Sequence, residues 1–280
     1  MSQDIKLGQC LWKDELYSCL YENDRVILLK ERNINFLLNS ANVDHLEKSE
    51  AIIGITEVQM EAPVKPSKIV CLGRNYQFHA KEMGEEVPDE PLLFLKPPSS
   101  VNGPDAPIIY PPQTKDLHYE GEVALVVRQR ISKTKKEDLS QIPRLYGVAC
   151  FNDVTARDLQ RKDKTWVRGK GFDTFACIGP WVVLEPIEKE YRIQTKVNGE
   201  VRQNGSTHLM KFQFLDILAY ISTIMTLEVG DVIATGTPAG VGSMHVADVV
   251  EVEINNIGRL RNQVVAVDLK KERKKGFDRE

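Results

Sequence analysis

The chain has 280 residues, with 37 lysines and arginines against 40 aspartates and glutamates, and hydrophobic residues make up 42% of it. This composition is typical of a folded globular protein and excludes a disordered or fibrous chain. The formal net charge of −3 argues against a surface that binds nucleic acid by neutralising its phosphates. We therefore expect no nucleic-acid partner.

The sequence also lacks the marks of export and membrane insertion. No stretch reaches the roughly 18 uncharged apolar residues of a membrane span, and the N-terminus lacks the apolar core of a signal peptide. The five cysteines are widely spaced and form no C-x-x-C motif, which argues against a disulfide scaffold or a structural zinc site. These observations predict a cytoplasmic protein with no membrane partner.

The first 60 residues carry runs typical of strands over 9–21 and 26–30, and then a polar stretch over 39–49 that predicts a loop or short helix. A proline-marked joint follows, Glu61-Ala-Pro-Val-Lys-Pro66. We place a boundary at this joint. The predicted parts are a small N-terminal domain over 1–63, a larger domain over 64–269 and a charged tail over 270–280.

Beyond the joint the pattern consists mainly of strands. Strands are predicted over 68–72, 119–128, 145–152 and 248–254, and Asn198-Gly199 predicts a hairpin within 195–202. There is no regular alternation of strands and helices. We therefore expect an α+β fold dominated by strands, not a doubly wound parallel sheet.

Two helices can be placed with defined ends. Apolar residues at helical spacing over 210–226 predict a helix that Gly230 closes. Residues 153–160 predict the end of a strand that leads into a helix, with Asp153 or Thr155 as its cap.

The motif Glu120-Gly-Glu122 is the first candidate for chemistry. Residues i and i+2 of a strand share a face, so both carboxylates project together. Such a pair is commonly the solvent face of an antiparallel strand, but the apolar run 123–127 favours burial, and buried paired carboxylates need a cation. Asp153 is the candidate third ligand, with helix capping as its alternative role. Three carboxylates without a matching Cys/His set favour Mg²⁺ or Mn²⁺ over zinc, with Ca²⁺ as a third candidate.

A second group of candidates includes a histidine and a lysine. His79 and Glu82 would share one face of a short helix, so Glu82 could orient His79 as a general base, although a lone histidine is more often structural. Lys170, between two glycines, could approach a ligand closely or simply lie in an exposed loop. The glycine-rich segment 235–242 matches no nucleotide-binding motif. Its backbone N–H groups could instead bind a carboxylate or an enolate of a ligand.

Taken together, these segments resemble the fumarylacetoacetate hydrolase family. The resemblance covers roughly residues 66–267, and its blocks occur in the family's order. The blocks are Cys71-Leu-Gly-Arg-Asn-Tyr-Gln-Phe-His79, Phe94-Leu-Lys-Pro97, His118-Tyr-Glu-Gly-Glu-Val-Ala-Leu125, Asn152-Asp-Val-Thr-Ala-Arg-Asp-Leu-Gln160, Gly169-Lys-Gly-Phe172 and Thr235-Gly-Thr-Pro-Ala-Gly-Val-Gly242.

The resemblance implies a β-sandwich roll for the larger domain and a homodimer. It implies Mg²⁺ or Mn²⁺ held by Glu120, Glu122 and Asp153. It further implies a catalytic set of His79, Glu82 and Lys170, and a substrate-binding set of Arg74, Lys96, Gln160 and Thr237. The chain is shorter than the eukaryotic enzyme that names the family and resembles the shorter bacterial members.

We expect a metal-dependent enzyme that cleaves a carbon–carbon bond in a small anionic 2-oxo or 1,3-dioxo acid, in the manner of an acylpyruvate or fumarylpyruvate hydrolase. With a divalent ion, the three acids and Lys170 sum to zero charge, and Arg74 and Lys96 would make the pocket positive, which suits such a substrate. The alternatives are a 2-hydroxyhepta-2,4-diene-1,7-dioate isomerase/decarboxylase or an oxaloacetate decarboxylase. Outside these enzymes, a ligand-binding relic without turnover and a carboxylate-rich structural protein stay open.

Overall fold

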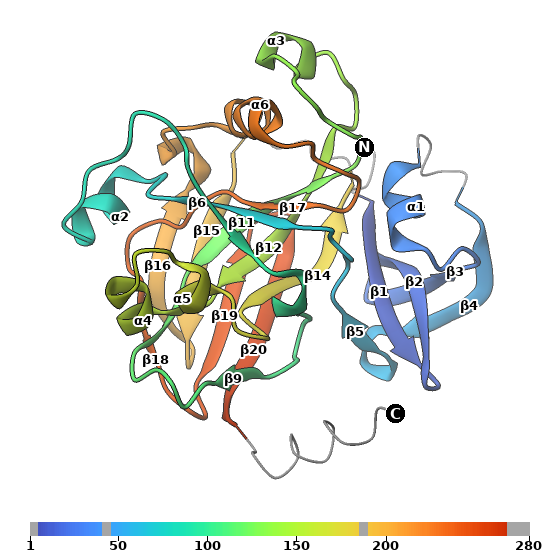
Figure 1. The fold of residues 1–280 in the computed structure, drawn as a ribbon. Coiled ribbons are helices and arrows are strands. Elements are labelled where there is room, and N and C mark those ends of the chain that lie inside the picture. Colours follow the sequence, from blue (N-terminus) through green and yellow to red (C-terminus); the bar gives the residue numbers. More distant parts are fainter. Residues whose placement is uncertain (1–4, 41–45, 185–189, 268–280) are drawn as a thin grey trace, which may run out of the picture.

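The computed structural model describes residues 5–40, 46–184 and 190–267. Strands dominate it, as the sequence predicts, and they form three sheets (Figure 1). The largest has 12 strands, with a main path of β4-β3-β2-β1-β14-β12-β11-β17-β6-β7, while β5 pairs with β1 and β8 with β14. Its strands are β1 Lys6–Trp12, β2 Glu15–Glu22, β3 Arg25–Leu29, β4 Lys48–Gly54, β5 Gln59–Glu61, β6 Ile69–Gly73, β7 Leu92–Lys96, β8 Val101–Asn102, β11 Gly121–Val127, β12 Tyr146–Asp153, β14 Ala176–Val183 and β17 Val232–Ala234.

Two smaller sheets complete the strands. The five-stranded sheet has the order β16-β15-β19-β20-β9, and the three-stranded sheet has the order β13-β10-β18. Their strands are β9 Ile108–Tyr110, β10 Leu117–Tyr119, β13 Thr155–Ala156, β15 Arg192–Val197, β16 Glu200–Ser206, β18 Gly242–Met244, β19 Val249–Ile254 and β20 Gly258–Ala266. The hairpin of β15 and β16 turns at Asn198-Gly199, both at positive φ, as predicted.

The helices are short and lie around the sheets (Figure 1). The α-helices are α1 Ile34–Asn39, α2 Gln77–Glu82, α3 Lys136–Leu139, α4 Arg157–Lys162, α5 Val167–Lys170 and α6 Phe214–Ile224, and single 3₁₀ turns occur at Ile55–Glu57, Pro98–Ser100 and Thr207–Leu209.

Strand β11 is buried on both of its faces, which explains its continuous apolar sequence. Val123, Leu125 and Val127 join one hydrophobic cluster with residues of the five-stranded sheet. Ala124 and Val126 join another cluster, which contains residues of β1, β2 and α1. The ends of β11 and β12 that carry Glu122 and Asp153 therefore lie in buried surroundings.

The N-terminal strands extend the large sheet. Lys6 and Leu7 of β1 pair with the end of β14, and the ring of Tyr21 stacks on Trp181 with centroids 4.0 Å apart. The predicted boundary at 62–66 falls between β5 and β6, and the predicted charged tail lies outside the described residues.

Three local predictions were wrong. The single strand predicted over 119–128 is two strands in different sheets, and Glu120 lies at the corner between them. Neither Asp153 nor Thr155 caps α4, because the Asp153 carboxylate contacts lysines and the Thr155 hydroxyl donates to the Asp153 carbonyl. Helix α6 already ends at Ile224, and Gly230, at φ 87°, serves a later turn.

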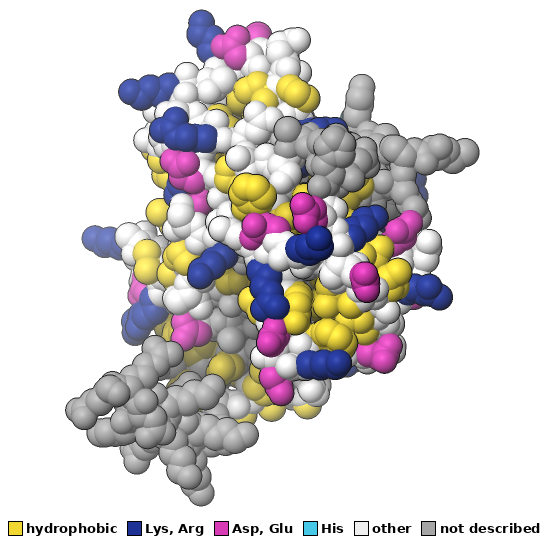
Figure 2. Space-filling view, turned by 90° about the vertical axis from the view of Figure 1, so that its right-hand side faces the viewer, with side chains coloured by type: hydrophobic (Ala, Val, Ile, Leu, Met, Phe, Trp, Pro, Cys, Tyr) yellow, Lys and Arg dark blue, Asp and Glu magenta, His cyan; other side chains and the backbone are white. Residues whose placement is uncertain are grey.

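The surface seen from the side of the N-terminal strands mixes both signs of charge. Figure 2 shows lysines and arginines scattered among aspartates and glutamates on this face, together with exposed hydrophobic side chains. Among the described helices, none is long and apolar enough to cross a membrane.

Arg128 provides a test of how residues 5–40 are held to the sheet. Its buried guanidinium donates hydrogen bonds to the carbonyl oxygens of Leu38, Ser40 and Leu184. Arg128→Met leaves these carbonyls without that donor, so we expect urea denaturation to show unfolding easier by on the order of 3 kcal/mol. Arg130→Gln, which removes an exposed ion pair with Glu228, should change it by less than about 1 kcal/mol. Equal effects would contradict the assignment.

Candidate active site

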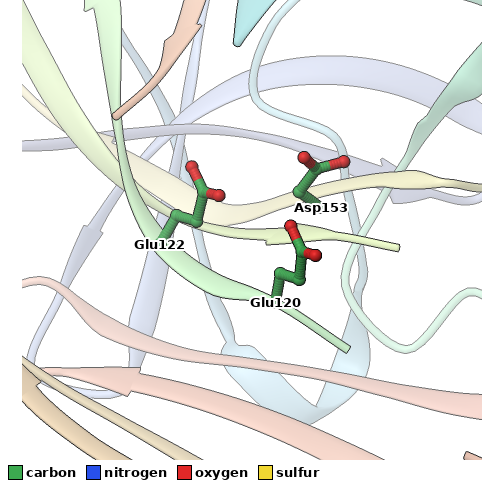
Figure 3. A group of neighbouring side chains, drawn as sticks. All are labelled: Glu120, Glu122 and Asp153. Atoms are coloured by element: carbon green, nitrogen blue, oxygen red, sulfur yellow. The ribbon is translucent and has the colours of Figure 1, made fainter. Parts of the chain in front are cut away.

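Three carboxylates meet where β11 and β12 run side by side (Figure 3). Glu120, Glu122 and Ala124 follow one another at steps of two residues, so their side chains point to the same side of the extended chain. Asp153 ends β12 on the same face, and its backbone N–H donates to the Glu120 carbonyl oxygen at 2.9 Å. All three side chains are buried. The strand pairing thus brings Asp153 beside the motif that the sequence singled out.

The residue between the two glutamates has no room for a side chain unless its neighbours shift. A Cβ atom on Gly121 would lie 2.1 Å from Thr195 Oγ1, a distance that no real contact allows. The Gly121 N–H donates to Gln203 Oε1 at 2.9 Å, and its carbonyl accepts from Thr237 Oγ1 at 2.8 Å. The five-stranded sheet and the glycine-rich segment therefore fix the backbone from which both carboxylates project.

Three buried cations face the three acids. Lys170 Nζ lies 2.7 Å from both Glu120 Oε2 and Asp153 Oδ2, and Lys96 Nζ lies 2.5 Å from Asp153 Oδ1. Arg157 pairs with the other oxygen of Glu120. With all three acids ionised, the formal charges of this cluster would cancel before any ion is added. Such mutual pairing is what allows ionised groups to stay buried.

The two glutamates differ in their electrostatic surroundings. Burial alone would raise the pKa of Glu120, but the charges of Lys170 and Arg157 outweigh it and hold that pKa well below its usual range. Burial raises the pKa of Glu122 far above its usual range, and Asp153 and Glu120 raise it further. The surroundings therefore favour the charged form of Glu120 and disfavour the charged form of Glu122.

The donor set fits a hard divalent cation. One oxygen from each carboxylate lies within 4.8 Å of the others. The set contains only oxygen atoms, which Mg²⁺, Mn²⁺ and Ca²⁺ prefer. Within the described ranges no ion pair involves Glu122, whose Oε2 accepts a hydrogen bond from the Gly236 N–H at 2.7 Å. A metal ion at this cluster would give Glu122 the positively charged partner that it lacks in the described structure.

A cavity of about 350 Å³ opens onto this cluster. Of the residues predicted to bind substrate, Arg74, Gln160 and Thr237 line it, whereas Lys96 is not among its lining residues. Lys96 is buried, and its ammonium contacts Asp153 and the Val154 carbonyl. The roles of all four stay predictions.

His79 and Glu82 come together on α2, as predicted. Nδ1 of His79 lies 3.4 Å from Glu82 Oε2, and the Gly240 N–H donates to the two Glu82 oxygens at 3.1 and 3.2 Å. Burial lowers the pKa of His79 even though Glu120 opposes it, so the imidazole is neutral at pH 7. A neutral imidazole in the cavity wall is available as a base.

Arg157 is the main residue that the sequence analysis missed. It is buried, lines the cavity and also donates through Nη1 to Gln160 Oε1 at 2.5 Å, while its Nε has no partner in the described structure. The available signal was the i, i+3 spacing of Arg157 and Gln160 directly after Asp153, which places both on one side of a helix.

Comparisons with known proteins agree on one family. Residues 68–265 match the family described as Fumarylacetoacetate (FAA) hydrolase C-terminal. Oxaloacetate tautomerase YisK of Bacillus subtilis is 39% identical over 233 residues, covering 78% of this chain and 77% of that protein. A 2-hydroxyhepta-2,4-diene-1,7-dioate isomerase structure from Mycobacterium marinum has a TM-score of 0.81 at 32% identity, covering 94% and 98% of the two chains. A fumarylacetoacetate hydrolase structure from Exiguobacterium antarcticum has a TM-score of 0.81 at 34% identity, covering 94% and 100%.

Glu122→Gln tests the metal site without changing its shape. The amide resembles the protonated carboxyl that the raised pKa implies, so the metal-free variant should unfold at the same temperature as the wild type or a higher one. Calorimetry should show that the affinity for Mg²⁺ or Mn²⁺ falls by roughly 100-fold or more, because an anionic ligand is lost. Glu253→Gln, an exposed partner of Lys196, is the control and should bind the metal normally. Full affinity in Glu122→Gln would exclude the site.

Proposed function

The chain belongs to the fumarylacetoacetate hydrolase family, and from this premise we propose that it is a divalent-metal-dependent enzyme that moves a proton between the keto and enol forms of a small 2-oxo acid. Oxaloacetate is the test substrate. An oxaloacetate tautomerase and a hydroxyheptadienedioate isomerase are among its relatives, which favours proton transfer on the substrate over bond cleavage as the first candidate.

The position of Lys170 is the observation that carries this proposal. Its ammonium lies 2.7 Å from two of the three candidate ligands and lines the cavity, so it lies beside the place where a bound keto oxygen would be. Burial alone would lower the pKa of Lys170, but Asp153 and Glu120 raise it, so the group stays cationic. A fixed positive charge at this place stabilises the negative oxygen of an enolate.

The metal ion, held by Glu120, Glu122 and Asp153, would supply Lewis-acid polarisation of the substrate's keto group. The second carboxylate oxygens of Glu120 and Asp153 accept hydrogen bonds from Arg157 and Lys96, which fixes the orientation of both groups. These contacts prepare the site before substrate enters.

His79 is the proposed carrier of the proton. Its Nδ1 faces Glu82, so Nε2 is the nitrogen left to face a substrate. Nε2 takes the proton from the enol oxygen and then gives a proton to the carbon next to the one that carries this oxygen, which produces the keto form. The same two proton transfers in reverse order convert the keto form to the enol. Glu82 stabilises the imidazolium that forms between these two steps.

Acylpyruvate hydrolysis is the second candidate, and the same pair of residues favours it. A base held by a carboxylate, as His79 is by Glu82, could deprotonate a water that attacks the distal carbonyl of the substrate. Cleavage would then leave a pyruvate enolate beside Lys170. The two reactions share the enolate site and differ in whether a water molecule reaches the substrate.

Lys170→Met tests the proposed enolate site. We expect the wild type with Mg²⁺ or Mn²⁺ to speed the loss of the near-ultraviolet absorption of enol oxaloacetate, compared with metal alone. Lys170→Met should lower this rate by roughly 100-fold, the scale of a lost oxyanion donor. The control is Lys30→Met, which removes an exposed lysine paired with Glu47. If the wild type leaves oxaloacetate unchanged and hydrolyses an acylpyruvate, the second candidate replaces the first.

The lowered pKa of His79 predicts the pH dependence of the reaction. A base acts when unprotonated, so a pKa below 6.5 keeps it active into mildly acidic solution. At saturating metal, the half-maximal point of kcat/KM on the acidic side should therefore lie below pH 6.5. His79→Asn should lower the rate by on the order of 100-fold. A half-maximal point above pH 6.5 would argue against His79 as the base.

A further inference from the structure

One wall of the cavity is aromatic. Phe94 of β7 and Trp166, which directly precedes α5, both line the cavity. Their rings meet edge to face, with centroids 5.1 Å apart. Leu72 and Met83 add aliphatic side chains to the lining. We call the two rings the aromatic wall.

The fold itself leaves this wall partly uncovered. Trp166 belongs to none of the three hydrophobic clusters formed by the described residues, and Phe94 only packs against the margin of one. Both side chains are half-buried. Apolar surface that stays open beside polar groups is typical of a ligand site. The wall therefore has the character of a binding surface.

The position of Trp166 is fixed by contacts on both sides. A Cβ atom on Gly73 would lie 2.8 Å from Cζ3 of Trp166, so the indole ring lies directly against the backbone of β6. Arg168 donates two hydrogen bonds to the carboxylate of Asp163, at 2.8 and 2.6 Å, and so closes the short segment that carries Trp166. A ring held in this way is ready for a ligand before the ligand binds.

The wall begins next to the proposed enolate site. Lys170 Nζ lies 5.0 Å from the centroid of the Phe94 ring, and the Lys170 N–H donates to the Trp166 carbonyl oxygen at 2.9 Å. In the proposed function the ammonium of Lys170 stabilises the enolate oxygen. A group attached to the carbon next to that of the enolate oxygen would therefore lie beside the wall.

The cavity also has room for such a group. Its volume of about 350 Å³ lies within the range of roughly 300–1,000 Å³ that is usual for sites that enclose a small-molecule ligand. A four-carbon acid is small for such a cavity. Space therefore remains for a larger group, and an aromatic wall suits a flat, apolar one.

A 2-oxo acid with an aryl group on C3 combines these features. The ring acidifies the C3–H bond and is conjugated with the enol, so the enol is flat. His79 would take the proton from C3, the electron pair of that bond would form the C=C bond, and the keto oxygen would gain a proton. The atoms and electrons balance without any further reactant.

We propose that the aromatic wall binds an aryl group on the reacting carbon, and that the chain therefore also tautomerises 3-aryl-2-oxo acids. This inference rests on the proposed function, from which it takes the metal ion, Lys170 and His79. It adds a class of substrate whose second group is apolar. Trp166 is then a residue that determines specificity, because its ring contacts the aryl group.

The test uses phenylpyruvate and pyruvate, which differ only in the phenyl group. Calorimetry with the full chain and saturating Mg²⁺ gives an affinity for each. We expect the wild type to prefer phenylpyruvate by roughly tenfold, because the phenyl ring is buried against the wall. With the metal it should also speed the loss of the near-ultraviolet absorption of enol phenylpyruvate, compared with metal alone.

Variants of Trp166 separate the wall from the rest of the site. Trp166→Ala should reduce the preference to about threefold and lower kcat/KM for phenylpyruvate by roughly tenfold, while kcat/KM for oxaloacetate changes by less than about threefold. Trp166→Phe keeps an aromatic face and should retain most of the rate with phenylpyruvate. The control is Phe36→Ala, which removes an exposed ring that does not line the cavity and should change neither substrate's rate.

The outcomes distinguish this inference from the proposed function. A wild type that acts on oxaloacetate but neither prefers phenylpyruvate nor speeds its tautomerisation overturns the inference and leaves the proposed function intact. Equal losses on both substrates in Trp166→Ala would show a general structural role and also overturn the inference alone. Oxalate engages the metal end only, so its failure to bind with the metal would overturn both.

Discussion

The site depends on one constraint: six ionisable side chains are buried at the ends of two strands that are apolar on both faces. An isolated charge in such surroundings would be far too costly, so each has to meet its opposite within hydrogen-bond distance. Lys96, Arg157 and Lys170 meet Asp153 and Glu120 in this way. Glu122 is the exception, because among the residues that the structure describes it has no ion pair and accepts a hydrogen bond from the Gly236 N–H. The acid that lacks a cationic partner is therefore Glu122, and a bound metal ion would supply that partner.

The fold holds this cluster from several directions at once. Gln203 and Thr237 bind the backbone of Gly121, and Gly236 binds the carboxylate of Glu122. Glu82 on α2 is bound in turn by Gly240. Segments more than 100 residues apart in the sequence therefore share the task of fixing a few oxygen atoms. A rigid cluster of this kind lowers the cost of organising charge during a reaction.

The sequence was sufficient for the parts of the site that follow from periodicity. The two-residue period placed Glu120 and Glu122 on one face, and the apolar flanks indicated burial. The pairing of Arg157 with Glu120 could not be predicted, because it depends on how segments 37 residues apart in the sequence pack together. The cap predicted for α4 failed for a related reason: Asp153 is drawn to two lysines, and tertiary charge pairing outweighs a local capping preference.

The contrast between Glu120 and Glu122 explains why one fold suits more than one reaction. They lie two residues apart in the sequence and have pKa values shifted in opposite directions. Lys170 and Arg157 form ion pairs with Glu120, whereas burial and the charges of Asp153 and Glu120 act on Glu122. This arrangement places one carboxyl whose charged form is favoured, one whose charged form is disfavoured and the ammonium of Lys170 in one small volume. Under the proposed function, it would stabilise an enolate, whichever bond of the substrate was changed to form that enolate. Under the proposed function, the choice between proton transfer and cleavage would rest on the cavity wall, where His79 and Glu82 would decide whether a water molecule joins the reaction.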